Sequence, residues 1–356
     1  MREQIQSLLT EFSFDQVSAL PLTTPVSMSF YQSWLDEGLN AQMSYLRDHL
    51  ETKKDLKHIL PDAQSTIVVT ESYFHHPEPH ESLKDVNQAF HIAKYAQGID
   101  YHYWFKNKLQ QACEKLKSAF PEHHFLPATD SQPIMERDFA YQAGLGWFGK
   151  NTCVIHSNKG SFFLIGEIIT SLPLSSTLPD ITVLHPDRCG KCTKCIEACP
   201  TEALSADSDS HTKTKLDASK CISYWTIEAK TTPPLALAKK FGTWFFGCDI
   251  CQDVCPWNQK VFEYKHQPVS PPSAQWSREH SLKTILEILN SSHKSLEKKF
   301  AGTPLTRPRG FGLKRNALIM ALNLKAIELI PTLETIDLGE KLNPFKDTVL
   351  SELKNP

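Results

Sequence analysis

The sequence predicts an α+β protein of three domains, and three successive patterns along the chain indicate this. Strand and helix patterns alternate over residues 1–180, cysteines crowd residues 181–265, and helical patterns alone occupy residues 266–356. The chain has 356 residues, of which 40% are hydrophobic and 22% charged. It is therefore long enough and apolar enough for more than one core.

The first domain, residues 1–180, is expected to be of the α/β or α+β type, with α/β favoured. Apolar residues at helical spacing from Phe105 to Phe120 predict one amphipathic helix. Short apolar runs predict four strands, at Ile67–Thr70, Phe125–Ala128, Cys153–His156 and Phe162–Ile169. Cys113 and Cys153 fall on these apolar patterns, which indicates buried core thiols.

A glycine-rich segment of this domain matches G-x-G-x-x-G, but its context is wrong for a dinucleotide site. In Gly144-Leu-Gly146-Trp-Phe-Gly149, the preceding residues Met135–Ala143 look helical and the following residues Cys153–His156 look like a strand. A dinucleotide fingerprint needs the opposite order. We therefore expect close backbone packing in a turn.

Four cysteines of the second domain form a run typical of bacterial ferredoxins. The segment Cys189-Gly-Lys-Cys192-Thr-Lys-Cys195-Ile-Glu-Ala-Cys199-Pro200 reads C-x2-C-x2-C-x3-C-P. Its short spacings let three thiolates reach three irons of one cluster from a single loop. The fourth cysteine, on the following helix, would bind the other cluster.

A second run completes two sets of four ligands. The segment Cys248-Asp-Ile-Cys251-Gln-Asp-Val-Cys255-Pro has the same ending, and it lacks only the first cysteine of the pattern. Phe245 stands at that position, and the isolated Cys221 restores the count. Pseudo-symmetry between the runs predicts two 4Fe–4S clusters, one on Cys189, Cys192, Cys195 and Cys255 and the other on Cys199, Cys221, Cys248 and Cys251.

Two other metal centres are less compatible with these spacings. Zinc also takes four cysteines, but it usually pairs two C-x2-C knuckles, whereas here three cysteines are followed by C-P. A radical-SAM cluster needs C-x3-C-x2-C, and neither Cys195–Cys199 nor Cys251–Cys255 is followed by a cysteine three residues on.

The compartment expected for the protein is the cytoplasm. The first residues, MREQIQSLLTEF, have no apolar core region or cleavage site of a signal peptide, and the longest apolar run, Phe162–Ile169, is far too short to span a bilayer. Cytosolic thiols stay reduced, so clustered cysteines there are more often metal ligands than disulfides.

The third domain is expected to be helical and locally basic. Gln267–Gln275 is rich in Pro and Ser and predicts a linker, and helical patterns follow at Leu282–Phe300 and Leu313–Leu333. Between Ser291 and Asn316 there are seven Lys or Arg and one acid, in a chain of net charge −2. Such a run is either a solvated helix face or a surface for a phosphate backbone.

Ordered segments over nearly the whole chain carry a resemblance to one family. They are Ala128-Thr-Asp130-Ser-Gln-Pro133 with Glu136-Arg137, Ala143–Thr152, the ferredoxin run, Cys221–Glu228, Gly247-Cys-Asp249-Ile-Cys251, Cys255-Pro-Trp-Asn258 and Gly312-Leu-Lys-Arg-Asn316. Together they resemble epoxyqueuosine reductases, the cobalamin-dependent enzymes of the last step in making queuosine in tRNA. Single segments are moderately specific, and the ordered set is what identifies the family.

The resemblance implies a cobalamin-binding catalytic domain at 1–180, a ferredoxin-like domain with two 4Fe–4S clusters at 181–265 and a HEAT-like, tRNA-binding module at 266–356. It implies an oxidoreductase that deoxygenates epoxyqueuosine in the tRNA anticodon loop with two electrons and protons, giving queuosine and water. Clusters pass single electrons, whereas a corrinoid cobalt can gather them and carry the difficult chemistry. The implied partners are this tRNA and a low-potential electron donor, with no membrane partner, and we expect a monomer.

The resemblance also assigns roles to single residues. Asp130 matches the family's proposed proton donor, which would need a raised pKa, although it also reads as a turn aspartate before a helix. The expected corrin contacts are Asp130, Asn151, Ser223 and Asp249. The segment Asp100-Tyr-His102 begins like the cobalt-binding motif D-x-H-x-x-G, but Phe105 stands where the motif has its glycine. We therefore expect His102 to line the pocket or to hydrogen-bond locally, and not to bind cobalt.

With the family in view, the basic run favours tRNA, and the residues expected to contact it are Lys230, Arg307, Arg309, Lys314 and Arg315. Two other functions compete with this one. A corrinoid reductive dehalogenase also couples a corrinoid to two clusters, but it typically carries a twin-arginine leader. A plain iron–sulfur electron carrier has no need of some 180 residues before its clusters.

Overall fold

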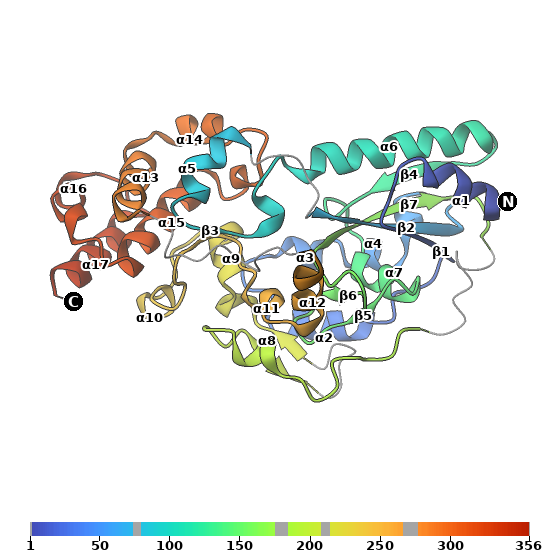
Figure 1. Cartoon of the computed structure of the whole chain (residues 1–356), viewed down its shortest axis with the longest axis horizontal. Helices are drawn as coiled ribbons and strands as arrows, with labels where there is room; N and C mark the ends of the chain where they lie inside the picture. The colour runs from blue at the N-terminus through green and yellow to red at the C-terminus, as the bar shows by residue number, and fades with distance from the viewer. Residues whose placement is uncertain (1, 74–79, 175–183, 208–213, 266–276, 356) are drawn as a thin grey trace.

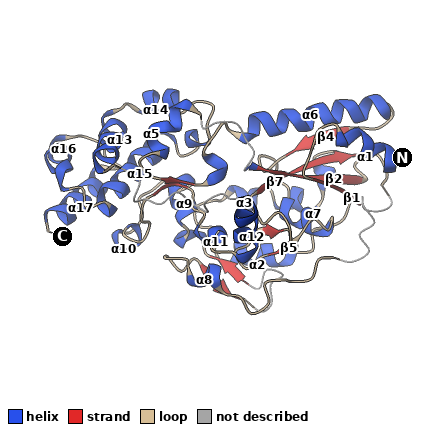
Figure 2. Ribbon diagram, in the orientation of Figure 1, coloured by secondary structure: helices blue, strands red, loops and turns tan. Residues whose placement is uncertain are grey.

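A computed structural model describes the chain except for residues 1, 74–79, 175–183, 208–213, 266–276 and 356. Its N-terminal sheet and its C-terminal helices lie at opposite ends, and the cysteine-rich segment lies between and below them (Figures 1 and 2). The predicted linker Gln267–Gln275 lies outside the described residues. No helix of the described part is long and apolar enough to cross a bilayer.

The N-terminal part is built on one four-stranded sheet with the order β1-β2-β7-β4. Its strands are β1 (Gln16–Pro21), β2 (Ser65–Ser72), β4 (Phe125–Ala128) and β7 (Phe163–Thr170). All three pairings are antiparallel. The expectation of an α/β domain is therefore wrong in this respect. Strands β2 and β4 do run in the same direction, but β7 is inserted between them, so no parallel ladder forms.

Helices cover the two faces of this sheet unequally. On one face lie α1 (Arg2–Thr10) and α6 (Tyr101–Ala119), and α6 runs along the sheet in Figure 1. Gly166 of β7 allows this approach, because a Cβ there would lie 2.8 Å from Leu109 and 2.9 Å from Phe105. The other face packs against α7 (Glu136–Gln142) through Phe139. Neighbouring residues of β7 thus face different cores.

The predicted elements of this part are largely confirmed. The amphipathic helix is α6, and the four predicted strands fall on β2, β4, β7 and β6 (Val154–Ile155). Strand β1 was not predicted. The remaining helices here are α2 (Met28–Asp36), α3 (Tyr45–Asp48), α4 (Leu50–Lys54) and α5 (Lys84–Asn87).

The G-x-G-x-x-G segment forms a tight turn into a hairpin, as expected. It follows α7 and continues into β5 (Trp147–Phe148), which pairs antiparallel with β6. A Cβ at Gly146 would lie 2.4 Å from the carbonyl oxygen of Ile155, so only glycine fits beneath the hairpin.

The cysteine-rich segment consists of short elements joined by loops. These are α8 (Lys194–Glu197), β8 (Leu204–Ala206), β9 (Thr214–Leu216), α9 (Ile222–Ile227), α10 (Leu235–Ala238), β10 (Trp244–Phe246), α11 (Ile250–Asp253) and α12 (Pro256–Lys265). Strand β10 pairs in parallel with β3 (His91–Ile92), so the two parts of the chain are joined by backbone hydrogen bonds.

The C-terminal part is helical, as predicted. Its helices are α13 (Arg278–Asn290), α14 (His293–Lys299), α15 (Arg309–Asn323), α16 (Ile330–Thr335) and α17 (Asn343–Lys354). Helix α5 lies among them although it is distant in sequence (Figure 1). Their apolar residues share one continuous core with Trp225 of α9 and Phe245 of β10. The C-terminal helices therefore fix the position of the cysteine-rich segment.

Candidate functional site

Asp130 lies two residues beyond the end of β4 and is held by two side chains of α6. The hydroxyl of Tyr101 donates a hydrogen bond to Oδ2 of Asp130. Nε2 of His102 lies 2.9 Å from Oδ1 of Asp130, and Nδ1 of the same ring lies 2.7 Å from Oδ1 of Asp100. Asp100 also caps α6 by accepting a hydrogen bond from the backbone of His102. The side chain of Asp130 is 45% exposed, so it can meet a ligand.

His102 is a cation at neutral pH in this arrangement. Hydrogen bonds to Asp100 and Asp130 raise its pKa to about 10. An imidazolium donates from both nitrogens and has no lone pair for a metal. The geometry therefore agrees with the expectation that His102 hydrogen-bonds locally.

Two further carboxyls, Glu136 and Glu167, lie behind Asp130, and no role was expected for either of them. Burial, and then the charge of Asp130, raise the pKa of Glu136 to about 8. Burial, and then the charges of Glu136 and Asp130, raise the pKa of Glu167 well above its usual range. Glu167 interrupts the apolar run of β7, which is the signal in the sequence that could have identified it.

The first predicted set of thiols is brought together at the hairpin. Cys189 and Cys255 pack in one small apolar cluster with Trp147. Burial raises the pKa of Cys195 to about 11, and the neighbouring thiols Cys189, Cys255 and Cys192 contribute. The four cysteines that pseudo-symmetry grouped are thus mutual neighbours.

The second predicted set is also brought together. Burial raises the pKa of Cys248 well above its usual range, and the thiols of Cys221 and Cys199 contribute. Cys251 is affected in the same way by Cys153, Cys248 and Cys221.

Both arrangements differ from the site of a single ion. No three His, Cys, Asp or Glu side chains of the described residues are grouped as ligands of one metal ion would be. In a 4Fe–4S cluster each thiolate binds a different iron, so four sulfurs surround the cluster instead of meeting at one atom.

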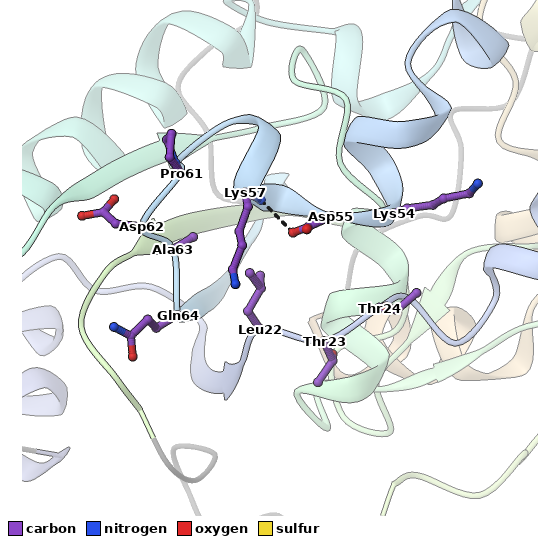
Figure 3. A pocket seen from close by; sticks show the side chains of 10 residues that line it. All are labelled: Leu22, Thr23, Thr24, Lys54, Asp55, Lys57, Pro61, Asp62, Ala63 and Gln64. Atoms are coloured by element: carbon purple, nitrogen blue, oxygen red, sulfur yellow. Dashed lines mark hydrogen bonds between the residues drawn. The ribbon is translucent and has the colours of Figure 1, made fainter.

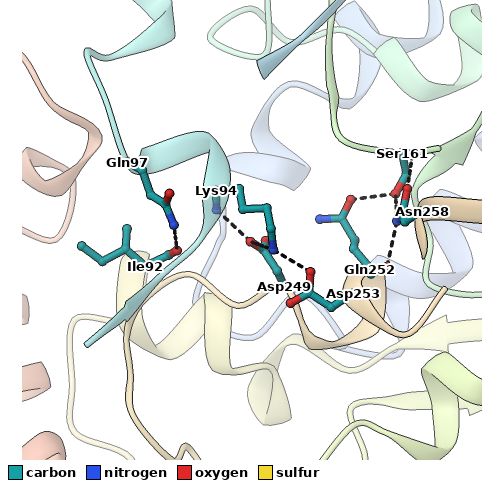
Figure 4. A network of polar contacts seen from close by, with 8 residues as sticks. All are labelled: Ile92, Lys94, Gln97, Ser161, Asp249, Gln252, Asp253 and Asn258. Carbon is teal, nitrogen blue, oxygen red and sulfur yellow. Dashed lines mark hydrogen bonds and ion pairs between the residues drawn. The ribbon is translucent and has the colours of Figure 1, made fainter. Parts of the chain in front are cut away.

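A polar network ties the cysteine-rich segment to the N-terminal part (Figure 4). Asp249, which is 2% exposed, accepts a 2.7 Å hydrogen bond from the backbone N–H of Lys94. The ammonium of Lys94 lies 2.6 Å from Oδ1 of Asp253. Farther along, Oδ1 of Asn258 accepts a 2.6 Å hydrogen bond from the backbone of Ser161. The loop that carries Cys248 and Cys251 is therefore fixed against residues 94 and 161.

The three expected corrin contacts other than Asp130 lie around the second set of thiols. Nδ2 of Asn151 donates to the carbonyl oxygen of Cys251 at 3.4 Å, and Oδ1 of Asn151 accepts from the backbone of Cys153 at 3.2 Å. Asn151 and Asp249 are buried and occupied by these internal contacts, whereas Ser223 on α9 is partly exposed. The contacts within the chain give Asn151 and Asp249 a structural role of their own.

Tyr95 connects Asp130 with the second set of thiols. Burial raises the pKa of its phenol, and the charges of Asp249 and Asp130 raise it further. Because Asp249 follows Cys248 directly in the chain, one partly buried side chain lies close to both the acid and the loop of the second set.

Three of the five expected tRNA contacts are exposed, and two are not. Lys230, Arg307 and Arg309 are exposed. Lys314 is 8% exposed and donates to the carbonyl oxygen of Leu289 at 2.8 Å. Arg315 is fully buried, and the expectation that it and Lys314 form a basic surface is wrong.

The reason for this burial is the central position of α15. Nη1 of Arg315 donates to the carbonyl oxygens of Ala229 and Thr231, and its guanidinium also bonds Oδ1 of Asn316. Helix α15 packs against α13, α14, α17 and α9, so Lys314 and Arg315 bind carbonyl oxygens inside the protein.

Arg307 belongs to the surroundings of Asp130. It forms a double hydrogen bond with Glu228, at 3.0 and 3.2 Å. Burial, the charge of Glu228 and, to a smaller extent, the charge of Asp130 raise the pKa of Tyr45, while Arg307 opposes this. Tyr45 thus lies close to the exposed basic residue and to the acid.

A separate pocket of about 660 Å³ lies at the far end of the sheet (Figure 3). It is lined by residues that precede β2 and follow β1, among them Leu22, Lys57 and Gln64. Asp130 lies beyond Ala128, whose partner on β7 is Glu167. Gln64 lies next to Ser65, whose partner Thr170 is at the other end of β7. The pocket is therefore remote from the acid.

Two family descriptions match segments of the chain. Residues 188–258 match the family described as 4Fe-4S double cluster binding domain, and they include all eight clustered cysteines. Residues 53–131 match the family described as Epoxyqueuosine reductase QueG, DUF1730, and they end one residue after Asp130.

Curated proteins match over most of the chain. The epoxyqueuosine reductase of Cyclobacterium marinum is 39% identical over 240 residues, which cover 67% of this chain and 73% of the relative. That of Leadbetterella byssophila is 34% identical over 316 residues, which cover 88% of this chain and 96% of the relative.

Solved structures share the fold over the whole length. The epoxyqueuosine reductase from Streptococcus thermophilus superposes with a TM-score of 0.79 at 23% identity, covering 100% of this chain and 91% of that one. A crystal structure of epoxyqueuosine reductase with a tRNA-Tyr epoxyqueuosine-modified tRNA stem loop gives a TM-score of 0.78 at 24% identity, with 100% and 90% coverage. The mixed α+β architecture is thus that of known structures.

Proposed function

The chain belongs to the epoxyqueuosine reductase family, and we propose that it deoxygenates epoxyqueuosine in a tRNA anticodon loop to give queuosine and water. The observation that carries this proposal is the position of Tyr95. Its ring lies 6.1 Å from the ring of Tyr101, which binds Asp130, and the preceding residue, Lys94, donates its backbone N–H to Asp249. An acid and the loop of a redox cluster therefore serve one reaction site. An electron carrier would need no acid at this position.

In this proposal the eight clustered cysteines bind two 4Fe–4S clusters that carry single electrons. Cys189, Cys192, Cys195 and Cys255 hold the outer cluster, and Cys199, Cys221, Cys248 and Cys251 hold the inner one. The grouping rests on the mutual influence of the thiols within each set. When bound, the clusters would supply one-electron transfer from a low-potential donor.

We propose cobalamin as the third cofactor, and the chemistry of the residues around Asp130 fits it. His102 is committed to two carboxylates as a cation, so it would not serve as a ligand of the cofactor's metal. Asp130 and Ser223 are the exposed or partly exposed polar side chains that would contact the corrin. Asn151 and Asp249, which are held by contacts within the chain, would support the loop that carries Cys248 and Cys251. When bound, the cofactor supplies a metal that collects single electrons and delivers them as a pair.

Asp130 is the proposed proton donor to the oxygen that leaves the substrate. Breaking the C–O bonds of an epoxide to give an alkene consumes two electrons and two protons, and the oxygen departs as water. The Tyr101 hydroxyl and the His102 imidazolium hold the Asp130 carboxyl in place for this transfer.

The proposed tRNA surface is the exposed basic group Lys230, Arg307 and Arg309. Arg307 lies close to Tyr45, and Tyr45 lies close to Asp130, so a phosphate backbone bound there would bring the modified nucleotide to the acid. We further propose that the chain acts as a cytoplasmic monomer of three domains with boundaries near residues 180 and 265.

The decisive experiment uses tRNA that carries epoxyqueuosine. The protein is reconstituted without oxygen, supplied with cobalamin and a strong reductant, and incubated with this tRNA, and the nucleosides are measured by mass spectrometry. We expect conversion of epoxyqueuosine to queuosine, with loss of the mass of one oxygen atom. Absence of conversion by protein that holds both clusters and the corrinoid would refute the proposal.

A further inference from the structure

Glu167 is a buried carboxyl that the fold leaves without a partner. It is 0% exposed, and neither of its oxygens has a hydrogen-bond partner among the described residues. A carboxyl in such a place is stable only in its neutral form, because no group compensates the charge of the carboxylate. The other residues of β7 on this face, Ile165 and Ile169, are apolar. An apolar residue would suit the core better, so the carboxyl needs an explanation.

The register of the sheet directs Glu167 toward the acid. Glu167 pairs with Val68 of β2 on one side and with Ala128 of β4 on the other. Paired residues of antiparallel strands point to the same face, so all three lie beneath α7. Asp130 follows Ala128 by two residues, beyond the end of β4, and its side chain is partly exposed.

Glu136 joins Glu167 and Asp130 into one group. It is the first residue of α7, the helix that covers Glu167. The charged groups that face the pair come from each neighbouring element: Asp130 after β4, Lys53 of α4, Arg137 of α7 and His102 of α6. The three cations act on Glu136 at the outer side, whereas the charges that act on Glu167 are those of Glu136 and Asp130.

We propose that Glu167 and Glu136 form an internal proton store that returns a proton to Asp130 after Asp130 has protonated the substrate oxygen. This inference rests on the proposed function, because it concerns the second of the two protons that the reaction consumes. Neither glutamate touches the substrate in this scheme, and both act through Asp130 as positioning residues.

The reaction consumes two protons, and the scheme supplies them one after the other. The first proton passes from the Asp130 carboxyl to the epoxide oxygen as one C–O bond breaks, which leaves Asp130 as a carboxylate. The pair then gives one of its protons to Asp130, which passes it to the same oxygen as the second C–O bond breaks and water leaves. The two electrons that balance these steps come from the low-potential donor. Afterwards the pair regains its proton from solvent.

The acidities of the groups allow this order. Asp130 only relays the proton, so the final acceptor sets the direction of the transfer. The oxygen that leaves is far more basic than a carboxylate, because it departs as water. The combined transfer from Glu167 to this oxygen is therefore favourable. An internal source is useful because tRNA and cofactor would shield Asp130 from solvent during the reaction.

The first test is spectroscopic and needs neither substrate nor cobalamin. Infrared difference spectra of the full-length protein with its clusters, recorded in H2O and D2O, detect the carbonyl stretch of a protonated carboxyl. We expect this band at pH 7 in the wild type and a clear loss of its intensity in Glu167→Gln. The matched control is Glu71→Gln, because Glu71 lies on the same sheet but its carboxylate pairs with Lys108 at 2.6 Å. Absence of the band in the wild type, or an unchanged band in Glu167→Gln, would overturn the proposal.

The second test is the pH dependence of turnover with epoxyqueuosine-containing tRNA. We expect Glu167→Gln and Glu136→Gln to lower kcat about tenfold or more, with KM nearly unchanged, and to alter the decline of the wild-type rate above pH 8. If Glu167→Gln did not fold, Glu136→Gln at the helix terminus would decide the question. Wild-type rates and an unaltered profile in both variants would refute the store while leaving the proposed function intact. A wild type without turnover would refute the function, and the infrared result would still decide the protonation of Glu167.

Discussion

Oδ1 of Asp130 lies 2.9 Å from Nε2 of His102, and this contact joins a loop after β4 to the first turn of α6. The second ring nitrogen of His102 is bound by Asp100, so the ring cannot turn away. Tyr101 donates to the other oxygen of Asp130. Two consecutive residues of one helix therefore fix both oxygens of the carboxyl that is closest to the proposed reaction.

The first prediction concerns Asp130 itself. Replacement of Asp130 by Ala should reduce turnover by about a hundredfold or more, which is the usual size of a lost general acid. Because the side chain is partly exposed and ligates neither cluster, the variant should keep its iron, its cobalamin and its affinity for tRNA. Iron analysis, the cobalamin absorption spectrum and tRNA binding are the controls. Turnover at the wild-type rate would exclude Asp130 as the acid.

The second prediction follows from the pKa of His102. Its folded-state value of about 10 lies above the ordinary 6.5, so the protonated ring stabilises the fold. This stabilisation is complete below pH 6.5 and is lost as the pH rises toward 10. Because the ring is 38% exposed, solvent screening reduces the effect to ~1 kcal/mol.

The measurement is the Tm of the wild type and of His102→Gln over this pH range. The wild type should be the more stable at pH 6 to 7, and the two curves should meet near pH 10. A difference in Tm that does not change with pH would show that the ring contributes through packing and not through its charge.

Local patterns were sufficient to predict much of this site. The spacing of the cysteines gave both sets of thiols, and the apolar period gave α6 and the strand that precedes Asp130. The arrangement of the strands could not be predicted in the same way. Insertion of β7 between β2 and β4 depends on a segment that follows β4 in the chain, and no local period reports such a pairing.

Burial of charged residues was equally inaccessible to local patterns. The sequence around Lys314 and Arg315 reads as a basic run. The burial of Arg315 depends on carbonyl oxygens of Ala229 and Thr231, more than eighty residues earlier, and that of Lys314 on the carbonyl oxygen of Leu289. Glu167 likewise stands in an apolar strand, and only the packing of α7 over it makes it a buried acid. Long-range packing decides which charges face solvent.

The third prediction separates the two sets of thiols. Cys221→Ser should remove the inner cluster and leave about four of the eight iron atoms per chain. The variant would have only three thiolates of this set to bind a cluster that needs four. Cys195→Ser should remove the outer cluster instead. Cys113→Ser is the matched control, since this thiol is buried in the core beside α1 and should leave the iron content unchanged.

The two cluster variants should also differ in activity. Electrons would enter at the outer cluster and leave from the inner one, so either loss should stop turnover with a one-electron donor. The electron paramagnetic resonance spectrum of each reduced variant should contain the signal of one cluster only. Two signals in Cys221→Ser would contradict the assignment of this ligand.

The last prediction distinguishes the exposed basic residues from the buried ones. Arg309→Ala should weaken tRNA binding and lower the slope of log affinity against log salt by about one, because one phosphate contact is lost. Its Tm should be unchanged. Arg315→Met should have the opposite effects: it leaves the carbonyl oxygens of Ala229 and Thr231 without donors and should cost ~3 kcal/mol of stability. At a temperature where it is folded, its salt slope should equal that of the wild type, since the guanidinium never reaches the surface. A reduced slope in Arg315→Met with an unchanged Tm would mean that α15 turns this side chain outward when tRNA binds.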